Sequence, residues 1–226
     1  MLDPNLVDEW IHKCGWSDGT TRSSRWIFSQ LGLAAKAGWS PQAETPRSRL
    51  AAPYSTRELK GVWETVASQH TARLRYVAAV IVTLGLATGA DGRNVPHLTR
   101  GDISSDVHGT WVQLQAPERR VPVHPRWEVF ISELRIGNPE DRLVGGRYTV
   151  NGELGAINQR RSYACPPIQL ARLRSTYVVE LIERRLPLQT LVAVTGLTTA
   201  GRLADFLPCC TKPTDDEIAR DVRGER

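Results

Sequence analysis

The sequence has little cysteine, and its cysteines and histidines are not arranged to hold a metal ion. Its 226 residues include four cysteines, of which Cys209 and Cys210 are adjacent, and none forms a C-x-x-C pair. The five histidines are scattered and complete no zinc-finger spacing. The sequence therefore predicts no metal site, and we expect the cysteines to be structural thiols in a reducing compartment.

Long apolar runs are also missing. The longest, residues 77–86, is interrupted by Thr83 and is far shorter than the roughly 20 residues that a membrane span needs. The first residues carry Asp3, Asp8 and Glu9 instead of the cationic and then apolar pattern of a secretory signal. No Gly-rich phosphate loop, Ser-His-Asp arrangement, repeat or low-complexity tract is visible. We therefore expect a cytoplasmic protein with no membrane partner and no cofactor.

Positive charge is present in excess, and arginine supplies most of it. The chain has 29 Lys and Arg residues against 24 Asp and Glu residues, which gives a formal net charge of +5. Such a surplus suits a polyanionic partner such as nucleic acid, although a GC-rich genome produces the same arginine-rich skew. The length allows one domain of ordinary size with a buried core, together with a smaller one.

Apolar spacing and turn signals divide the chain into four regions. Residues 1–40 carry apolar residues at helical spacing and predict two short helices. Residues 41–53 are rich in Pro, Ser, Ala and Arg, which is typical of an exposed linker. Residues 54–207 predict the main domain, and the acidic stretch in 208–226 predicts a solvated tail.

The main domain is predicted to be mainly α with a small antiparallel β-sheet, an α+β fold. Ser55 and Glu58 form a capping box that begins a helix extending to about residue 69. Three short strands are expected over residues 103–105, 110–115 and 119–123, with a hairpin turn between the first two. Further helices are expected over residues 72–88, 125–134, 154–163, 168–185, 188–194 and 198–207.

Two ungapped stretches resemble sequence landmarks of the tyrosine recombinases, also called phage integrases. Residues 171–177, Ala-Arg-Leu-Arg-Ser-Thr-Tyr, are similar to the H-x-L-R-H-T-[FY] signature. Residues 87–91, Ala-Thr-Gly-Ala-Asp, followed by Leu98 and residues 102–103, resemble A-T-G-[LM]-R…L…D-I. The resemblance covers residues 54–207 and implies the catalytic-domain fold of that family. It also makes residues 1–40 similar to part of a core-binding domain.

The same resemblance implies that the residues that cut DNA have been replaced. The family's first arginine falls on Asp91, its first histidine on Ala171, its histidine or tryptophan after Gly196 on Leu197, and its nucleophilic tyrosine on Phe206. Only Arg174 is kept, and no lysine lies near residues 114–116, where the family has its hairpin lysine.

These replacements predict a site that does not cleave DNA. Phe206 has no oxygen to attack phosphorus, so covalent catalysis is lost. A carboxylate of Asp91 at roughly 4–5 Å repels a phosphate by about 3–4 kcal/mol at an effective dielectric constant near 20. Two alternatives are that Arg93 moves into the place of the first arginine, or that Tyr177 replaces the nucleophile. The second requires Tyr177 to leave the helix face that should point into the core.

Asp91 and Arg174 are also predicted to form a salt bridge that plugs the former phosphate site, because an arginine in a partly buried concavity needs a counter-charge. The alternative is that Arg174 reaches solvent or meets the DNA backbone.

The sequence therefore predicts a non-catalytic, sequence-specific protein that binds double-stranded DNA, a regulator or repressor from a phage or mobile element. The alternative is a decoy that pairs with itself or with an active integrase and modulates its assembly. The expected DNA-binding residues are Arg22, Arg25, Lys36, Arg47, Arg49, Arg73, Arg75, Arg93, Arg119, Arg120, Arg160, Arg161, Arg172 and Arg174.

Overall fold

The computed structural model describes residues 50–145, 149–197 and 200–223. The chain divides into two units, residues 1–50 and 51–226, and the description below concerns the second. The two helices expected over residues 1–40 and most of the linker lie outside the described residues.

Two helices at the start of the domain form as the sequence predicts. Helix α3 (Thr56–Ala67) begins at the Ser55 capping box, in which the Ser55 and Glu58 side chains accept each other's backbone N–H groups. Helix α4 (Ala72–Thr88) has the predicted bounds, because Thr71 caps its first turn and Gly89 ends it in the left-handed conformation. Most of α4 is buried, which makes it the central helix of the domain.

The predicted small sheet is present. Strands β1 (Ile103–Asp106), β2 (Gly109–Gln115) and β3 (Glu118–Pro122) pair antiparallel in the order β1-β2-β3. Alternate residues of β2 are buried, and Val112 faces Ile103 on one side and Val121 on the other. The predicted fold class, mainly α with a small antiparallel sheet, is confirmed.

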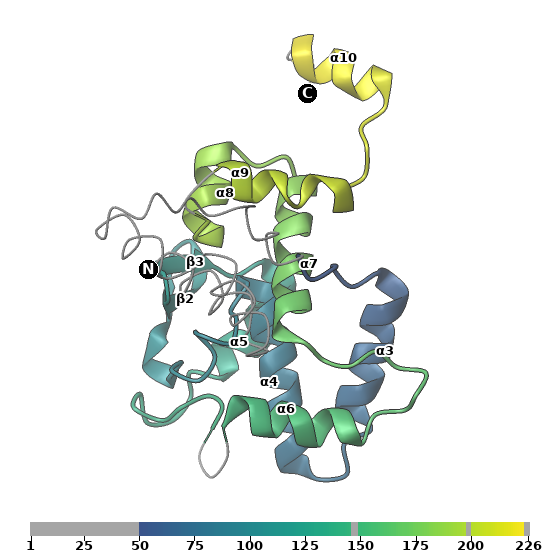
Figure 1. The fold of residues 1–226 in the computed structure, drawn as a ribbon. Coiled ribbons are helices and arrows are strands. Elements are labelled where there is room, and N and C mark those ends of the chain that lie inside the picture. Colours follow the sequence, from purple (N-terminus) through teal and green to yellow (C-terminus); the bar gives the residue numbers. More distant parts are fainter. Residues whose placement is uncertain (1–49, 146–148, 198–199, 224–226) are drawn as a thin grey trace, which may run out of the picture. The chain divides into compact units, whose positions relative to one another are not determined.

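Six further helices follow the sheet within the described part of the chain. Figure 1 shows α6 crossing near one end of α4, and α8 and α9 near the far end of α7. Their bounds are α5 Pro125–Glu133, α6 Val150–Gln159, α7 Leu170–Glu183, α8 Leu188–Thr195, α9 Ala200–Ala204 and α10 Asp215–Arg223.

Two helix predictions are corrected, and the tail contains a helix. The helix expected over residues 154–163 lies four residues earlier, because the Thr149 hydroxyl accepts the Gly152 N–H at 3.2 Å and caps it there. The helix expected over 198–207 is shorter and gives way to a 3-10 turn at Leu207–Cys209. The tail expected to be solvated contains α10, and the side chains of α10 are exposed or half-buried.

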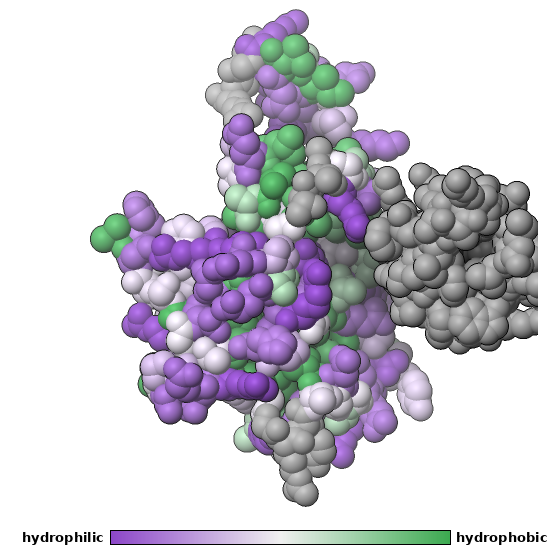
Figure 2. Space-filling view, turned by 60° about the vertical axis from the view of Figure 1, so that its left-hand side comes forward, coloured by the Kyte–Doolittle hydropathy of each residue, from purple (hydrophilic) through white to green (hydrophobic). Residues whose placement is uncertain are grey.

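Hydrophobic side chains from all of these elements except α10 meet in one core, which includes Ile81 and Leu84 of α4 and Leu173 of α7. The face of the molecule in Figure 2 is mostly hydrophilic, with apolar residues in smaller areas between the polar ones. Among the described residues no helix is long and apolar enough to cross a membrane.

Candidate functional site

The candidate site lies where the end of α4 meets α7, and glycines set the close approach of the two helices. A Cβ atom at Gly85 would lie 2.8 Å from the Cβ of Leu173. A Cβ at Gly89 would lie 2.5 Å from the Cδ1 of Tyr177, and the φ angle of Gly89, 64°, also disfavours a side chain. The contact therefore brings Arg174, which lies between Leu173 and Tyr177 on α7, to the turn that follows α4.

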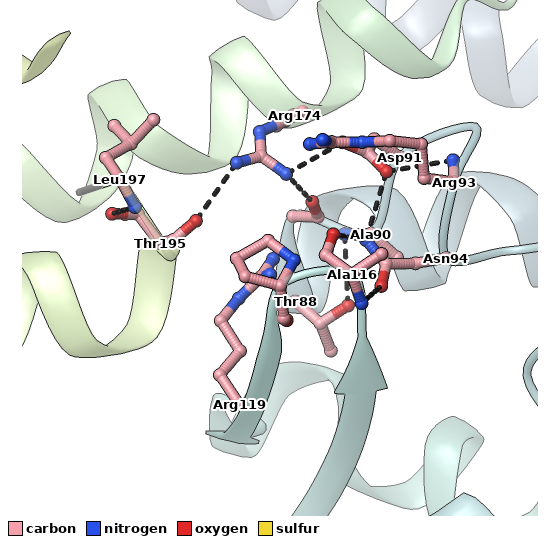
Figure 3. A network of polar contacts seen from close by, with 12 residues as sticks. Thr88, Ala90, Asp91, Arg93, Asn94, Ala116, Arg119, Arg174, Thr195 and Leu197 are labelled. Carbon is pink, nitrogen blue, oxygen red and sulfur yellow. Dashed lines mark hydrogen bonds and ion pairs between the residues drawn. The ribbon is translucent and has the colours of Figure 1, made fainter.

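Arg174 is the centre of a polar network (Figure 3). Its Nη1 donates to the Oδ2 of Asp91 at 3.0 Å and to the carbonyl of Gly89 at 3.3 Å. Its Nη2 donates to the carbonyl of Thr195, directly before Gly196, at 3.0 Å. The side chains of Arg174 and Asp91 are 14% and 16% exposed. The predicted salt bridge between Asp91 and Arg174 is confirmed and is direct, whereas its role as a plug of the phosphate site stays a prediction.

The turn after α4 holds the Asp91 carboxylate in place. Its Oδ1 accepts the backbone N–H of Arg93 and the Nδ2 of Asn94, both at 3.0 Å. The Arg93 guanidinium donates to Oδ2 at 3.1 Å and stays largely exposed. Burial raises the pKa of Asp91, but the two hydrogen bonds from Arg93 and the charge of Arg174 outweigh it and hold the pKa below its ordinary value. Asp91 is therefore a fixed anion, and Arg93 is held by it instead of replacing the missing arginine.

Asn94 joins this turn to the sheet. Its Nδ2 donates to the carbonyl of Ala116 at 3.0 Å, and its Oδ1 accepts the Ala116 N–H at 2.9 Å. Ala116 lies between β2 and β3, so the hairpin is pinned beside the site by a pair of hydrogen bonds. This arrangement places the side chain of Arg119, on β3, next to Arg174 (Figure 3).

Arg119 is the site residue that the sequence reading missed in this role. The side chain is buried, with 8% exposed, and its Nε donates to the carbonyl of Val194 at 3.0 Å. Its Nη1 donates to the carbonyl of Pro117, and its Nη2 has no hydrogen-bond partner among the described residues. Burial first and the charge of Arg174 second lower the pKa of Arg119 to about 10, so the group remains charged at neutral pH.

The sequence offers no lysine near residues 114–116, where the resemblance places a hairpin cation. Arg119 supplies one from three residues beyond Ala116, and only the register of β3 turns its side chain inward. Gly196 allows this, since a Cβ there would lie 2.9 Å from the Nη1 of Arg119.

The site keeps a surplus of positive charge. Three guanidinium groups, those of Arg93, Arg119 and Arg174, surround the one carboxylate of Asp91, which leaves two positive charges without a counter-charge in this network. Two of the three arginines are mostly buried, where an uncompensated charge is costly. An anionic group, such as a phosphate, would compensate them.

The other positions marked by the resemblance carry no group for acid–base or nucleophilic chemistry. Ala171 is exposed on α7, and Leu197 is half-buried against the core. Phe206 is buried in the core with 4% exposed. Tyr177 also lies in the core, as expected, and burial raises the pKa of its hydroxyl far above the ordinary value. Among the described residues no group of three or more His, Cys, Asp or Glu side chains could hold a metal ion.

The remaining arginines proposed to bind DNA are spread over the domain, and most have partners within it. Arg172 lies over the ring of Tyr54 at 4.0 Å and donates to Glu58, which anchors the start of the domain to α7. Arg120 pairs with Asp106 on the exposed side of the sheet and lies over Trp111.

Four more arginines have partners near the opposite end of α4. Arg73 pairs with Glu153, and Arg160 contacts His70. Arg75 and Arg161 donate to the backbone carbonyls of Gln69 and Cys165. Arg22, Arg25, Lys36, Arg47 and Arg49 lie outside the described residues. DNA contact by any of these residues remains a prediction.

Known structures match this chain in fold, whereas no protein-family model and no curated protein sequence matches it. The Tn1549 transposon integrase in complex with circular intermediate DNA aligns with a TM-score of 0.63 and 13% identity, over 100% of this chain and 87% of that one. The XerH site-specific recombinase bound to its difH substrate aligns with a TM-score of 0.58 and 14% identity, over 98% of this chain and 70% of that one. The catalytic domain of bacteriophage HP1 integrase aligns with a TM-score of 0.51 and 15% identity, over 76% of this chain and 94% of that one. The chain therefore has the fold of the tyrosine recombinases.

Proposed function

We propose that this chain is a catalytically inactive relative of the tyrosine recombinases that binds double-stranded DNA and regulates a phage or mobile element, in the cytoplasm of its host. The observation that carries the proposal is the site itself, where the retained Arg174 and its neighbour Arg119 are both largely buried while the nucleophile is absent. A site that retains positive charge without an attacking group is suited to hold a phosphate and not to cleave it.

DNA binding is supported by the fold, the charge of the site and the nature of the structural neighbours. XerH and the Tn1549 integrase were both solved bound to DNA. Arg174, whose side chain is 14% exposed, can offer its guanidinium to a backbone phosphate, and the buried Arg119 beside it adds positive charge to the same site. Contacts of this kind position a protein on a duplex without reading its sequence. Sequence preference would then come from other parts of the chain.

Inactivity is supported by the chemistry of four positions. Phe206 offers no hydroxyl, Asp91 places a fixed negative charge beside Arg174, and Leu197 and Ala171 offer no proton donor. Asp91→Arg should therefore strengthen phosphate binding without restoring cleavage.

The test of inactivity is a nicked duplex substrate that traps any covalent protein–DNA intermediate. No adduct should form with the wild-type chain. An adduct that maps to any tyrosine would overturn the assignment.

The test of DNA binding is a titration of duplex DNA at several salt concentrations. Affinity should fall steeply with salt, and charge reversal of Arg22 with Arg25, or of Arg119 with Arg120, should weaken binding and reduce the salt slope. If both double variants bind as the wild type does, the DNA assignment fails.

A decoy that modulates an active integrase is the second candidate, and α10 is the observation that favours it. This helix exposes Ile218 and Val222, while its acidic residues Glu217 and Asp221, which lie on the adjacent face, pair with Arg185. An exposed apolar face of this kind suits a protein partner. A decoy would inhibit an integrase in a recombination assay without binding DNA itself.

A further inference from the structure

A pocket lies directly behind the arginine site, between α4, α5, α7 and α8. Its volume is about 280 Å³. Most of its wall is apolar, formed by residues that include Leu86, Ala87, Val123, Leu181, Leu186 and Val194. An apolar cavity of roughly 150 Å³ takes up a benzene molecule, so this pocket has room for a bicyclic ring or a branched chain.

The polar side chains of the pocket favour a negatively charged ligand. Arg126 and Arg184 both pair with Glu180, so two cations share one carboxylate. His124 also lines the pocket, and burial first and the neighbouring arginines second lower its pKa, which keeps it neutral at pH 7. The rim therefore carries one surplus positive charge beside an apolar interior.

The volume of the pocket, its apolar wall and the positive charge at its rim together define the class of ligand. A compact molecule with an apolar body and one carboxylate would bury its body against the apolar wall. Its carboxylate could take a guanidinium N–H from Arg126 or Arg184 at the rim.

Two residues of the pocket wall are tied to the arginine site. Val194 lines the pocket, and its carbonyl accepts the hydrogen bond from the Nε of Arg119. Tyr177 lines the pocket and packs against Gly89, whose carbonyl accepts from Arg174. A ligand that moves α8 or the Tyr177 ring would therefore shift the acceptors that hold both buried arginines.

We propose that this pocket is an effector site for small aromatic or branched aliphatic carboxylates, and that its occupancy changes the affinity of the adjacent arginine site for DNA. The coupling rests on the proposed DNA-binding function, whereas ligand binding does not. Coupling between two sites is reciprocal, so DNA should change the ligand's affinity by the same factor.

The experiment uses calorimetry on the full chain without DNA, with indole-3-acetate as the probe and indole-3-acetamide as its uncharged counterpart. The acetate should bind at one site, and the acetamide at least fivefold more weakly. Thr190→Trp should abolish acetate binding, because Thr190 lines the pocket and is exposed enough to accept a larger side chain. Gln189→Trp is the matched control at the neighbouring exposed position, and it should bind as the wild type does.

Arg184→Gln provides a second variant that keeps the core intact, since Arg184 is exposed. This variant should bind indole-3-acetate more weakly and indole-3-acetamide with unchanged affinity. The pocket assignment would be overturned if the wild type bound neither indole-3-acetate nor 4-methylpentanoate at concentrations on the order of 10 mM. Unchanged binding by Thr190→Trp would do the same.

The coupling is tested by repeating the DNA titration with saturating indole-3-acetate, where the DNA affinity should change at least fivefold. An unchanged affinity would overturn the regulatory half of the proposal. A chain that binds the acetate but no DNA at all would instead contradict the proposed function, so the two failures can be told apart.

Discussion

The two ends of α4 use arginine in opposite ways. Near its start, Arg73 pairs with Glu153, and the acid is buried at 2% exposed while the cation is half-exposed at 49%. Near its end, Arg174 and Asp91 are both largely buried, and Arg119 adds a second buried cation beside them. One end compensates a buried acid with a cation that reaches water, whereas the other buries more cations than acids.

The difference separates a structural ion pair from the site that we propose to bind DNA. At the start of α4, the charges of Arg73 and Glu153 balance, and the pair joins α4 to α6. At the other end, the surplus of buried positive charge is costly unless an anion comes to the site. The predictions below test whether the two ends differ in this way.

The largest effect is expected from alanine at Gly89, which ends α4. Gly89→Ala should cost about 2–4 kcal/mol, because the new Cβ would meet the Tyr177 ring and occupy a left-handed conformation. Gly155→Ala on α6 is the control, since nothing lies within 4 Å of its Cβ position and alanine favours the helix by about 0.5–1 kcal/mol. Urea unfolding measures both, and equal midpoints would refute the close contact of α4 and α7.

The next effect concerns the acid at the site. Asp91→Ala should cost about 1–3 kcal/mol of unfolding free energy, because Arg174 loses its partner while it remains buried. The same variant should bind duplex DNA more tightly, since a fixed negative charge has been removed. Asp141→Ala is the control, because Asp141 is 60% exposed and lies 4.0 Å from Arg100, and it should change stability by less than about 0.5 kcal/mol.

The stability cost of Asp91→Ala should also depend on pH. The folded protein holds the pKa of Asp91 below its ordinary value of 3.8, so the stabilisation is fully present above that value. It should be lost as the pH falls through the lowered pKa of the folded state. Unfolding of both proteins between pH 2 and 7 measures the difference, and a gap that stays constant over the acidic range would contradict an ionic role for Asp91.

A smaller effect should distinguish the two neighbouring arginines of β3. Arg119→Met should weaken DNA binding about fivefold to tenfold and lower the salt slope by about one, because it removes a buried cation of the site. Arg120→Met should change affinity less than about twofold, since Arg120 is half-exposed and already paired with Asp106. Equal losses would mean that the sheet surface, and not the site, meets the DNA.

Much of this fold could be predicted because residues close in sequence fix the ends of its helices. The Ser55 capping box, the Thr71 cap and Gly89 fix the ends of α3 and α4. The tail carries the same kind of local signal, since Thr214 and Glu217 accept each other's N–H groups at the start of α10. The ion pairs from Arg185 that hold α10 join residues more than 30 positions apart, so no local pattern could predict them.

The site was predictable in part for a different reason. Asp91 and Arg174 could be paired because both landmarks align without gaps, so the fold of the family places them together. Arg119 could not be identified in this way, because its role depends on the register of β3 and on the space left by Gly196. The phosphate repulsion expected from Asp91 alone therefore left out the cation that offsets it.

The most direct test of the central claim combines binding and chemistry in one measurement on a nicked duplex. The wild type and Asp91→Arg are each incubated with the substrate, and both bound and covalently linked DNA are quantified. The account predicts salt-dependent binding by the wild type, tighter binding by Asp91→Arg, and no covalent adduct with either. A covalent adduct on any tyrosine of the wild-type chain would contradict it.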